Sequence, residues 1–171
     1  PLTVTVNNAW RNQGAANPPF SGSITGLQNG DNITASYSTT ATTSSVPGAY
    51  PIMASLIDPN NRLGNYNVMN NPGTLTILNS CGITVNPATL PTATLGKPFA
   101  QTLSASPTGS YSFSLLAGTL PPGLQIVNVL GIYSLRGTPT MAGVYTFLIK
   151  ARKNNSTCES ARTYTIVIAP S

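Results

Sequence analysis

Few side chains in this sequence could carry out acid–base or nucleophilic chemistry. Its 171 residues include no histidine and only three carboxylates, Asp31, Asp58 and Glu159. Without imidazole, Ser-His-Asp hydrolysis, Cys-His proteolysis and most catalytic zinc sites are excluded. A paired-carboxylate glycosidase or a calcium site with several acidic ligands is hard to build from three acids, two of which lie in evident turns. The sequence therefore predicts no catalytic residues, no metal site and no cofactor.

The basic residues outnumber the acids, and the formal net charge is +5. Their one local concentration is Lys150, Arg152, Lys153 and Arg162. An excess of positive charge can attract an anionic partner, but no aromatic platform stands beside this cluster, which argues against nucleic-acid binding. Odd-numbered residues of Tyr145–Ala151 are apolar, so Lys150 and Arg152 are predicted on the wet face of a strand. The simplest prediction is a solvated hairpin end.

The composition favours an all-β chain. Charged residues make up 6 % of the sequence, against roughly a quarter in an ordinary soluble domain. Threonine, serine and asparagine take their place, and they suit strand faces and turns better than solvent-facing helices. Hydrophobic alternation with a period of two predicts strands at Leu2–Val6, Ile33–Ser38, Tyr50–Ile57, Thr74–Leu78, Phe99–Ala105, Ser110–Leu115, Ile132–Leu135, Val144–Ala151 and Arg162–Ile168.

The chain divides into two small β modules in tandem. Asn29-Gly30-Asp31 and Asp58-Pro-Asn-Asn61 are turn signals within the first, and Thr39–Pro47 is a low-complexity, exposed connection or edge. After Leu78 the pattern restarts, because Ile83-Thr-Val85-Asn86 repeats the opening Leu2-Thr-Val-Thr-Val6-Asn7. The predicted modules are residues 1–78 and 79–171. No apolar stretch of ~18 residues is present, so membrane insertion is not expected. The start at a proline is expected of a processed product or an excised fragment.

A string of glycines and prolines marks the second module. It comprises Thr119-Leu-Pro-Pro-Gly-Leu124, Gly131 to Thr140 with Gly137-Thr-Pro-Thr, and Ala142-Gly-Val-Tyr-Thr-Phe147. It resembles the bacterial putative-Ig domain, a cadherin-like seven-strand β-sandwich whose members occur as repeats in large secreted and surface proteins. The resemblance covers about Cys81 to Ile168. It implies an Ig-like β-sandwich, although Arg152-Lys-Asn-Asn155 stands where many relatives carry an aspartate, so a cadherin-type calcium role is not implied.

The first module resembles a different family. Leu2-Thr-Val-Thr-Val6-Asn-Asn-Ala9, Arg11, Gly14-Ala-Ala-Asn-Pro18, Phe20-Ser-Gly22 and Ile24-Thr-Gly-Leu27 match the MBG-type repeat of bacterial adhesins, which is seen in tandem arrays. Gln13 stands where an aromatic residue is often found, and Trp10 could supply the lost ring. The resemblance implies a small Ig-like or β-grasp-like module.

The two resemblances bear on the cysteines and on location. Cys81 and Cys158 could be buried thiols or a metal pair, but a zinc site would lack further ligands. In relatives of this shape, cysteines at these positions imply a disulfide between the first strand and the last hairpin. That bond in turn implies an oxidising, extracellular or cell-surface setting.

Other side chains have a structural and a functional interpretation. Trp10, Tyr50 and Tyr66 could stack on sugars, but core packing is the simpler expectation. Lys97 or Lys150, with an asparagine and with Glu159 or Asp58 as the acid, could form an intramolecular isopeptide bond of the kind found in some bacterial surface modules.

Two classes of function remain, and neither is enzymatic. The favoured one is a structural repeat or subunit of a bacterial extracellular filament, stalk or adhesin, with copies or neighbouring repeats arranged head to tail. The alternative is an adhesive module that recognises a glycan or a host or matrix protein through Thr39–Pro47 or the Lys150 to Arg162 hairpin. If copies are separate chains, the strand Leu2, Thr3, Val4, Thr5, Val6 or the strand Tyr164–Ile168 is predicted to pair with a neighbour's sheet edge.

Overall fold

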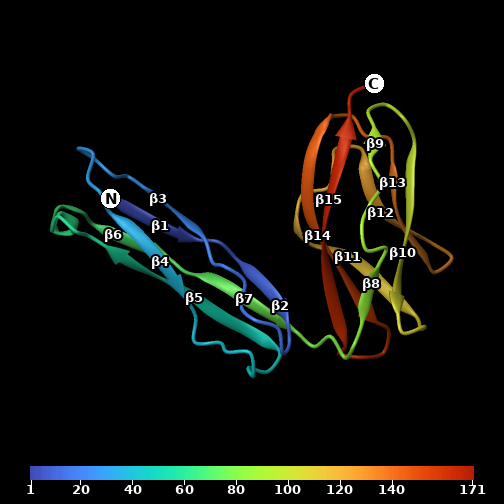
Figure 1. Ribbon diagram of the computed structural model, residues 1–171, viewed down its shortest axis with the longest axis horizontal. Helices are drawn as coiled ribbons and strands as arrows, with labels where there is room; N and C mark the ends of the chain where they lie inside the picture. Colours follow the sequence, from blue (N-terminus) through green and yellow to red (C-terminus); the bar gives the residue numbers. More distant parts are fainter. The chain divides into compact units, whose positions relative to one another are not determined.

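The computed structural model describes residues 1–171, which fold as two compact units, Pro1–Leu78 and Asn79–Ser171 (Figure 1). We call them the N-terminal and the C-terminal unit. Both are built from β-strands, and the one helical element is the short 3-10 helix η1 at Leu63–Asn65. None of the helical structure has the length and apolarity needed to span a membrane. The chain is therefore all-β, with two modules in tandem.

Two sheets make up the N-terminal unit. Its strands are β1 (Leu2–Val6), β2 (Ala9–Asn12), β3 (Gly22–Thr25), β4 (Thr34–Ser38), β5 (Gly48–Ile57), β6 (Val68–Asn71) and β7 (Gly73–Leu78). One sheet has the order β3-β1-β6 and the other the order β2-β7-β5-β4. β1 is antiparallel to β3 and parallel to β6, and β2 is parallel to β7. These parallel pairs bring distant parts of the unit's sequence together.

Alternation along β1 anchors the core of the N-terminal unit. Leu2 and Val4 are fully buried, and Val6 joins a core cluster with Ile52 and Leu75 of the other sheet. Thr5 points to solvent, as the period of two requires. With two sheets packed on each other and no α-helix, the unit corresponds to the Ig-like alternative and not to the β-grasp-like one.

A buried arginine fixes the connection between β4 and β5. Arg11 is only 4 % exposed, and its Nε donates to Asn17 Oδ1 at 2.7 Å while Nη2 donates to the carbonyl oxygen of Thr42. Asn17 Nδ2 in turn donates to the carbonyl oxygen of Ala41 at 2.7 Å. The predicted connection Thr39–Pro47 lacks strand structure and is largely exposed, but these bonds tie it to β2.

Both predicted turns of the N-terminal unit are present. Asn29 and Gly30 have φ of 55° and 69°, the left-handed region that this residue pair tolerates. In the second turn, backbone hydrogen bonds from Arg62 and Leu63 lower the pKa of Asp58. The bond from Leu63 N to Asp58 Oδ2 measures 2.6 Å. This carboxylate therefore caps the entry to η1.

The C-terminal unit is a β-sandwich of two four-stranded sheets. Its strands are β8 (Thr84–Asn86), β9 (Ala93–Thr94), β10 (Phe99–Ser106), β11 (Tyr111–Gly118), β12 (Leu124–Val129), β13 (Ile132–Gly137), β14 (Gly143–Lys153) and β15 (Glu159–Ala169). The sheets have the orders β12-β13-β10-β8 and β11-β14-β15-β9. Their facing sides enclose one apolar cluster that includes Leu103, Leu135, Phe147, Ile149, Tyr164 and Ile166.

Two glycines of the motif that carries the family resemblance lie where the backbones of two segments meet. Gly123 has φ +90°, and a Cβ there would lie 2.0 Å from the carbonyl oxygen of Thr138. A Cβ on Gly137 would lie 2.0 Å from the carbonyl oxygen of Gly123. No real Cβ fits at that distance, so the entry to β12 and the end of β13 can pack only through glycine.

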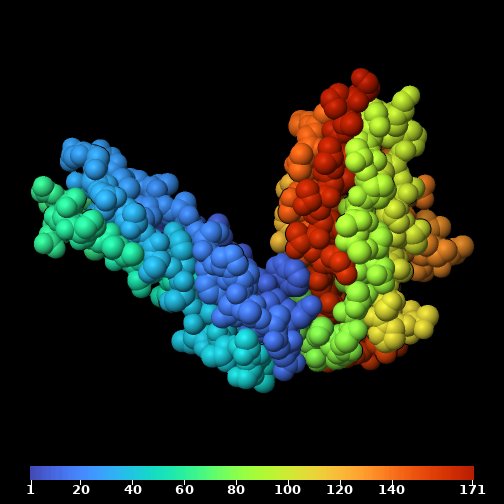
Figure 2. Space-filling view, in the orientation of Figure 1, coloured from blue at the N-terminus to red at the C-terminus, as the bar shows by residue number.

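The turn between β12 and β13 carries exposed apolar side chains. Leu130 and Gly131 have φ of 51° and 84°, and Leu130 is 99 % exposed. Val129 and Ile132 on either side are also exposed. Figure 2 shows this turn as an orange projection from the C-terminal unit.

Candidate binding site at the β14–β15 hairpin

The long hairpin of β14 and β15 places Lys150 and Arg152 on the outer face of its sheet, whereas Arg162 lies opposite Ile149 and donates to the carbonyl oxygen of Val85 in the facing sheet. The strands pair antiparallel from Gly143 opposite Ile168 to Arg152 opposite Glu159. Phe147, Ile149 and Ala151 are buried, so Lys150 and Arg152 project from the opposite face, as the alternation predicts. The sequence-based expectation of a solvated hairpin end is correct for this stretch.

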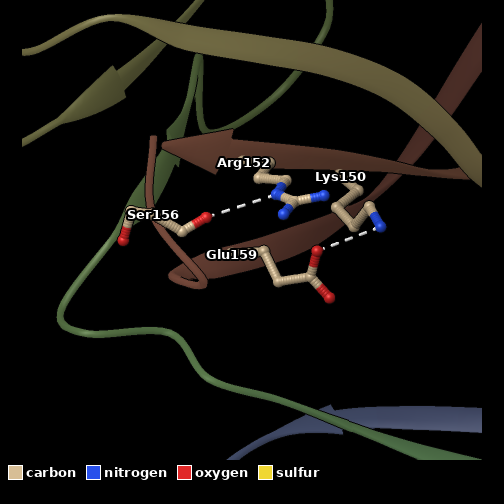
Figure 3. A network of polar contacts seen from close by, with 4 residues as sticks. All are labelled: Lys150, Arg152, Ser156 and Glu159. Atoms are coloured by element: carbon tan, nitrogen blue, oxygen red, sulfur yellow. Dashed lines mark hydrogen bonds and ion pairs between the residues drawn. The ribbon is translucent and has the colours of Figure 1, made fainter. Parts of the chain in front are cut away.

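Two polar contacts organise the cluster (Figure 3). Lys150 Nζ forms an ion pair with Glu159 Oε2 at 3.1 Å, and each of these side chains is 24 % exposed. Arg152 Nε donates to the carbonyl oxygen of Ser156 at 3.3 Å. Glu159 is paired with Lys150, so neither Arg152 nor the neighbouring Lys153 has an ion-pair partner in the chain.

The predicted disulfide is present and anchors the turn end of the hairpin. Cys81 and Cys158 are bonded, and their Cα atoms lie 5.6 Å apart. Two backbone bonds reinforce the junction: Lys153 N donates to the carbonyl oxygen of Cys158 at 3.0 Å, and Glu159 N donates to that of Asn79 at 2.7 Å. The first residues of the unit are thus held against the start of β15.

An open depression of about 950 Å³ lies at the hairpin turn. A neighbouring loop helps to shape it, because Asn154 donates to Ser110 through its backbone N–H at 2.9 Å and through Nδ2 at 2.7 Å. The lining residues are Ser112, Arg152, Lys153, Asn154, Asn155, Ser156 and Thr157. This set supplies guanidinium, ammonium, amide and hydroxyl donors but no carboxylate, thiol or aromatic ring. It can bind an electron-rich group, and it offers no general base.

Charge is distributed unevenly between the units. The C-terminal unit holds six of the eight Lys and Arg residues and one of the three acids, a formal charge of 6 − 1 = +5. The N-terminal unit holds the other two basic residues and the other two acids, so its formal charge is 2 − 2 = 0. All of the net charge therefore resides in the unit that contains the depression.

The strand predicted to pair with a neighbouring copy already has a partner on each side within its own unit. Leu2, Thr3, Val4, Thr5 and Val6 form β1, which pairs with β3 on one side and with β6 on the other. β1 is therefore the central strand of its sheet and not an open edge. The sequence did not indicate this, because nothing in it reveals the parallel partner β6. Pairing with a neighbour would require β1 to leave this sheet.

The alternative strand, Tyr164–Ile168, lies within β15. It pairs with β14 on one side, and β9 pairs with its end at Ile168 and Ala169. Arg162 Nε donates to the carbonyl oxygen of Val85 at 2.6 Å, and Tyr164 donates to that of Pro87 at 2.7 Å. Figure 2 shows the red β15 flanked by the yellow-green segment that contains β8 and β9. The backbone of this edge is therefore paired at Ile168 and Ala169, and side-chain bonds tie the strand to the segment beside it.

None of the side chains considered for sugar stacking and cross-linking lines the depression. Trp10, Tyr50 and Tyr66 are half-buried. Tyr50 packs against the core, and the hydroxyl of Tyr66 donates to Asp31 Oδ2 at 2.7 Å. Lys150, a candidate for an isopeptide bond, is instead ion-paired and partly exposed. These side chains therefore have structural roles in the N-terminal unit and the hairpin.

The fold defines the chain as two β modules in tandem, of which the C-terminal one is a disulfide-bonded β-sandwich. It belongs to the family described as "Putative Ig domain", whose model matches residues 82–169, just over half of the chain. Residues 2–76 match the model of the "MBG domain (YGX type)". Both resemblances expected from the sequence are thereby confirmed, in the expected order. Such domains are typical of extracellular surface proteins, where they serve as adhesive or structural and not catalytic modules, and the disulfide is consistent with that location.

Comparison with solved structures gives only distant likenesses. An endo-fucoidan hydrolase of glycoside hydrolase family 107 is 13 % identical with a TM-score of 0.41, and the match covers 99 % of this chain and 29 % of the hydrolase. The tandem Ig repeats of Dlar are 12 % identical with a TM-score of 0.43, covering 100 % of this chain and 99 % of that one. Drosophila N-cadherin EC1-4 is 10 % identical with a TM-score of 0.37, covering 99 % and 50 %. No curated protein matches the sequence.

Proposed function

We propose that this chain is a structural repeat of a bacterial extracellular filament, stalk or adhesin, in which copies or successive repeats follow one another head to tail. The observation that carries the proposal is that each unit begins and ends with a strand. The N-terminal unit runs from β1 to β7, and the C-terminal unit runs from the segment around β8 to β15. A chain with this organisation can be continued at either end by the same strand–linker–strand joint that connects β7 to β8.

The buried pairing of β1 changes how copies could join. A neighbour cannot add to an edge that β3 and β6 already occupy, so non-covalent assembly through β1 would exchange this strand between copies. Covalent repetition within a longer chain needs no exchange. Both routes give an open-ended, heterologous arrangement that does not close on itself.

Electron microscopy and light scattering of the native material test the proposal. We expect rods or stalks, or a longer precursor that contains several repeats. The proposal is refuted if the native protein is a 17.7 kDa monomer at high concentration and no longer precursor is detectable.

A cross-link distinguishes the two routes. Thr5 lies opposite Ser23 in the β1–β3 pair, so Thr5→Cys with Ser23→Cys is designed to fix β1 in its own sheet. If non-covalent assembly depends on exchange of β1, the oxidised variant remains monomeric and its reduced form assembles. Assembly of both forms would exclude strand exchange and leave head-to-tail contacts between folded units.

A further inference from the structure

We propose that the depression at the β14–β15 turn binds the sulfate or carboxylate groups of an acidic polysaccharide. This binding site does not depend on head-to-tail assembly, because all of its residues belong to the C-terminal unit. The residues that would contact the anionic groups are Arg152 and Lys153, with the side chains of Asn154 and Asn155 as additional donors.

The first argument is the unbalanced charge. Lys150, Arg152 and Lys153 lie within four residues of one strand, and Glu159 is the one acid of the whole unit. Lys150 Nζ forms an ion pair with Glu159 Oε2 at 3.1 Å. Arg152 and Lys153 are both exposed and both line the depression. An anionic ligand would neutralise these two charges, which no acid of the chain balances.

The second argument is rigidity. The turn that carries the donors is held by the disulfide at Cys158, by the bond from Lys153 N to the carbonyl oxygen of Cys158, and by the two bonds from Asn154 to Ser110. Arg152 is itself oriented by its bond to Ser156. A turn backbone held in this way loses little conformational freedom on binding, which favours affinity.

The third argument identifies the ligand class. Nucleic-acid and neutral-sugar sites usually present aromatic side chains for stacking, and none lines this depression. A guanidinium beside an ammonium and several amide and hydroxyl donors is suited to oxyanions, which accept charge-assisted hydrogen bonds. The depression is open and not enclosed, so a long chain could cross it with its anionic groups facing the donors. A sulfated or carboxylated polysaccharide fits these features.

Binding of the full-length, disulfide-bonded chain to dextran sulfate, to polygalacturonate and to uncharged dextran tests the proposal. The variant Arg152→Gln with Lys153→Gln removes the two unpaired cations of the depression. The matched control Lys97→Gln with Arg136→Gln removes two exposed cations elsewhere in the same unit and gives the same net charge. Affinity is measured by biolayer interferometry at about 0.15 M salt, where charges farther apart than about 8 Å are largely screened.

We expect the wild type and the control variant to bind dextran sulfate or polygalacturonate within about twofold of each other, with no binding to dextran. The Arg152/Lys153 variant should bind at least about tenfold more weakly, since two charge-assisted contacts are lost. Equal losses in both variants would show that only the overall charge matters and would overturn the proposal. It is also overturned if neither acidic polymer binds, or if single-stranded DNA binds as tightly as the polysaccharides.

Discussion

Arg11 brings a positive charge into the interior of the N-terminal unit without a carboxylate beside it. Its guanidinium donates to Asn17 Oδ1 and to the carbonyl oxygens of Asn12 and Thr42. Burying a charge is costly unless its donors are satisfied, and here backbone and amide dipoles satisfy them. The same bonds stabilise the exposed connection Thr39–Pro47. This residue is therefore structural, and it explains why Arg11 and Asn17 belong to one sequence pattern.

Replacing Arg11 by alanine is expected to destabilise the N-terminal unit by about 2–3 kcal/mol, since the carbonyl and amide groups it satisfies would lose their partner. Trp10 is the only tryptophan of the chain, so its fluorescence during urea titration reports this unit alone. The control is Arg62→Ala, at an exposed position, which should stay within about 0.5 kcal/mol of wild type. Similar losses in the two variants would contradict a specific role for Arg11.

Leu130 is unfavourable at its position in two respects. It is 99 % exposed, and its φ of 51° lies in the left-handed region, where asparagine and glycine are preferred over branched side chains. We expect Leu130→Asn to stabilise the C-terminal unit by about 0.5–1 kcal/mol. Calorimetric unfolding provides the measurement. Leu130→Ala keeps the backbone strain and should change stability less; a larger gain from alanine would show that exposure and not φ is the dominant penalty.

At the scale of the strands, alternation in the sequence was a reliable guide where one face of a strand is buried. All nine predicted segments overlap observed strands, and β1 and β4 differ by at most one residue from their predicted bounds. Of the six other strands, β8 is indicated only by its repeat of the opening motif, and alternation does not reveal β2, β3, β6, β9 and β12, most of which are short or lack a buried face. All four residues of β6 are exposed, so its parallel pairing with β1 depends on tertiary contacts that have no local signal.

The close contact between the ends of β12 and β13 predicts different effects for two similar glycines. Gly123 and Gly131 have φ of +90° and +84°, but a Cβ at Gly131 would meet no atom within 4 Å. Gly131→Ala should therefore cost about 1 kcal/mol from backbone strain alone. Gly123→Ala adds a collision with the backbone and should cost about 3 kcal/mol or more. Thermal unfolding of the C-terminal unit distinguishes the two, and equal costs would refute the close contact.

Tyr164 links β15 to the segment after β8 and makes the C-terminal unit sensitive to alkali. Burial raises the pKa of Tyr164 to about 12 from an ordinary value of 10.0. Its hydroxyl donates to the carbonyl oxygen of Pro87. The unfolded state loses the tyrosine proton first, so this contribution is complete below pH 10 and is lost as the pH rises from 10 to 12.

The expected loss from this one group is about 2–3 kcal/mol across that pH range. Urea titrations at a series of alkaline pH values, followed by hydrogen exchange of the C-terminal unit, measure it. Tyr164→Phe should be less stable than wild type at neutral pH, because the hydrogen bond is lost, and should show a smaller decline above pH 10. An unchanged decline in the variant would assign the alkaline sensitivity to other groups.

At the scale of the whole molecule, the sequence located the basic residues of the candidate site but not the shape of the site. Lys150, Arg152 and Lys153 are visible as a cluster in the sequence. The depression exists because Ser110, more than forty residues earlier, receives hydrogen bonds from Asn154. Such a long-range contact is decided by the packing of β11 against β14 and has no signature in either segment. The pairing of Cys81 with Cys158 is also a long-range contact without a local signature, so it could be predicted only from the family resemblance.

The disulfide also determines how the C-terminal unit would respond to a mechanical pull. Cys81 lies close to the first residue of the unit, and Cys158 directly precedes β15, the last strand. Tension applied at the two ends of the unit passes from residue 81 through the sulfur atoms to residue 158. It bypasses residues 82–157, which include seven of the unit's eight strands.

Single-molecule pulling on the full chain tests this consequence. Residues 82–157 correspond to about 260 Å of extended chain. We expect that length to be absent from the unfolding step of the oxidised protein and to appear after reduction or in the variant Cys81→Ser with Cys158→Ser. Steps of equal length under both conditions would contradict the predicted force path. With the bond intact, the load is carried by β15 and by the few residues before Cys81, and residues 82–157, which include every residue lining the basic depression, are shielded from the force.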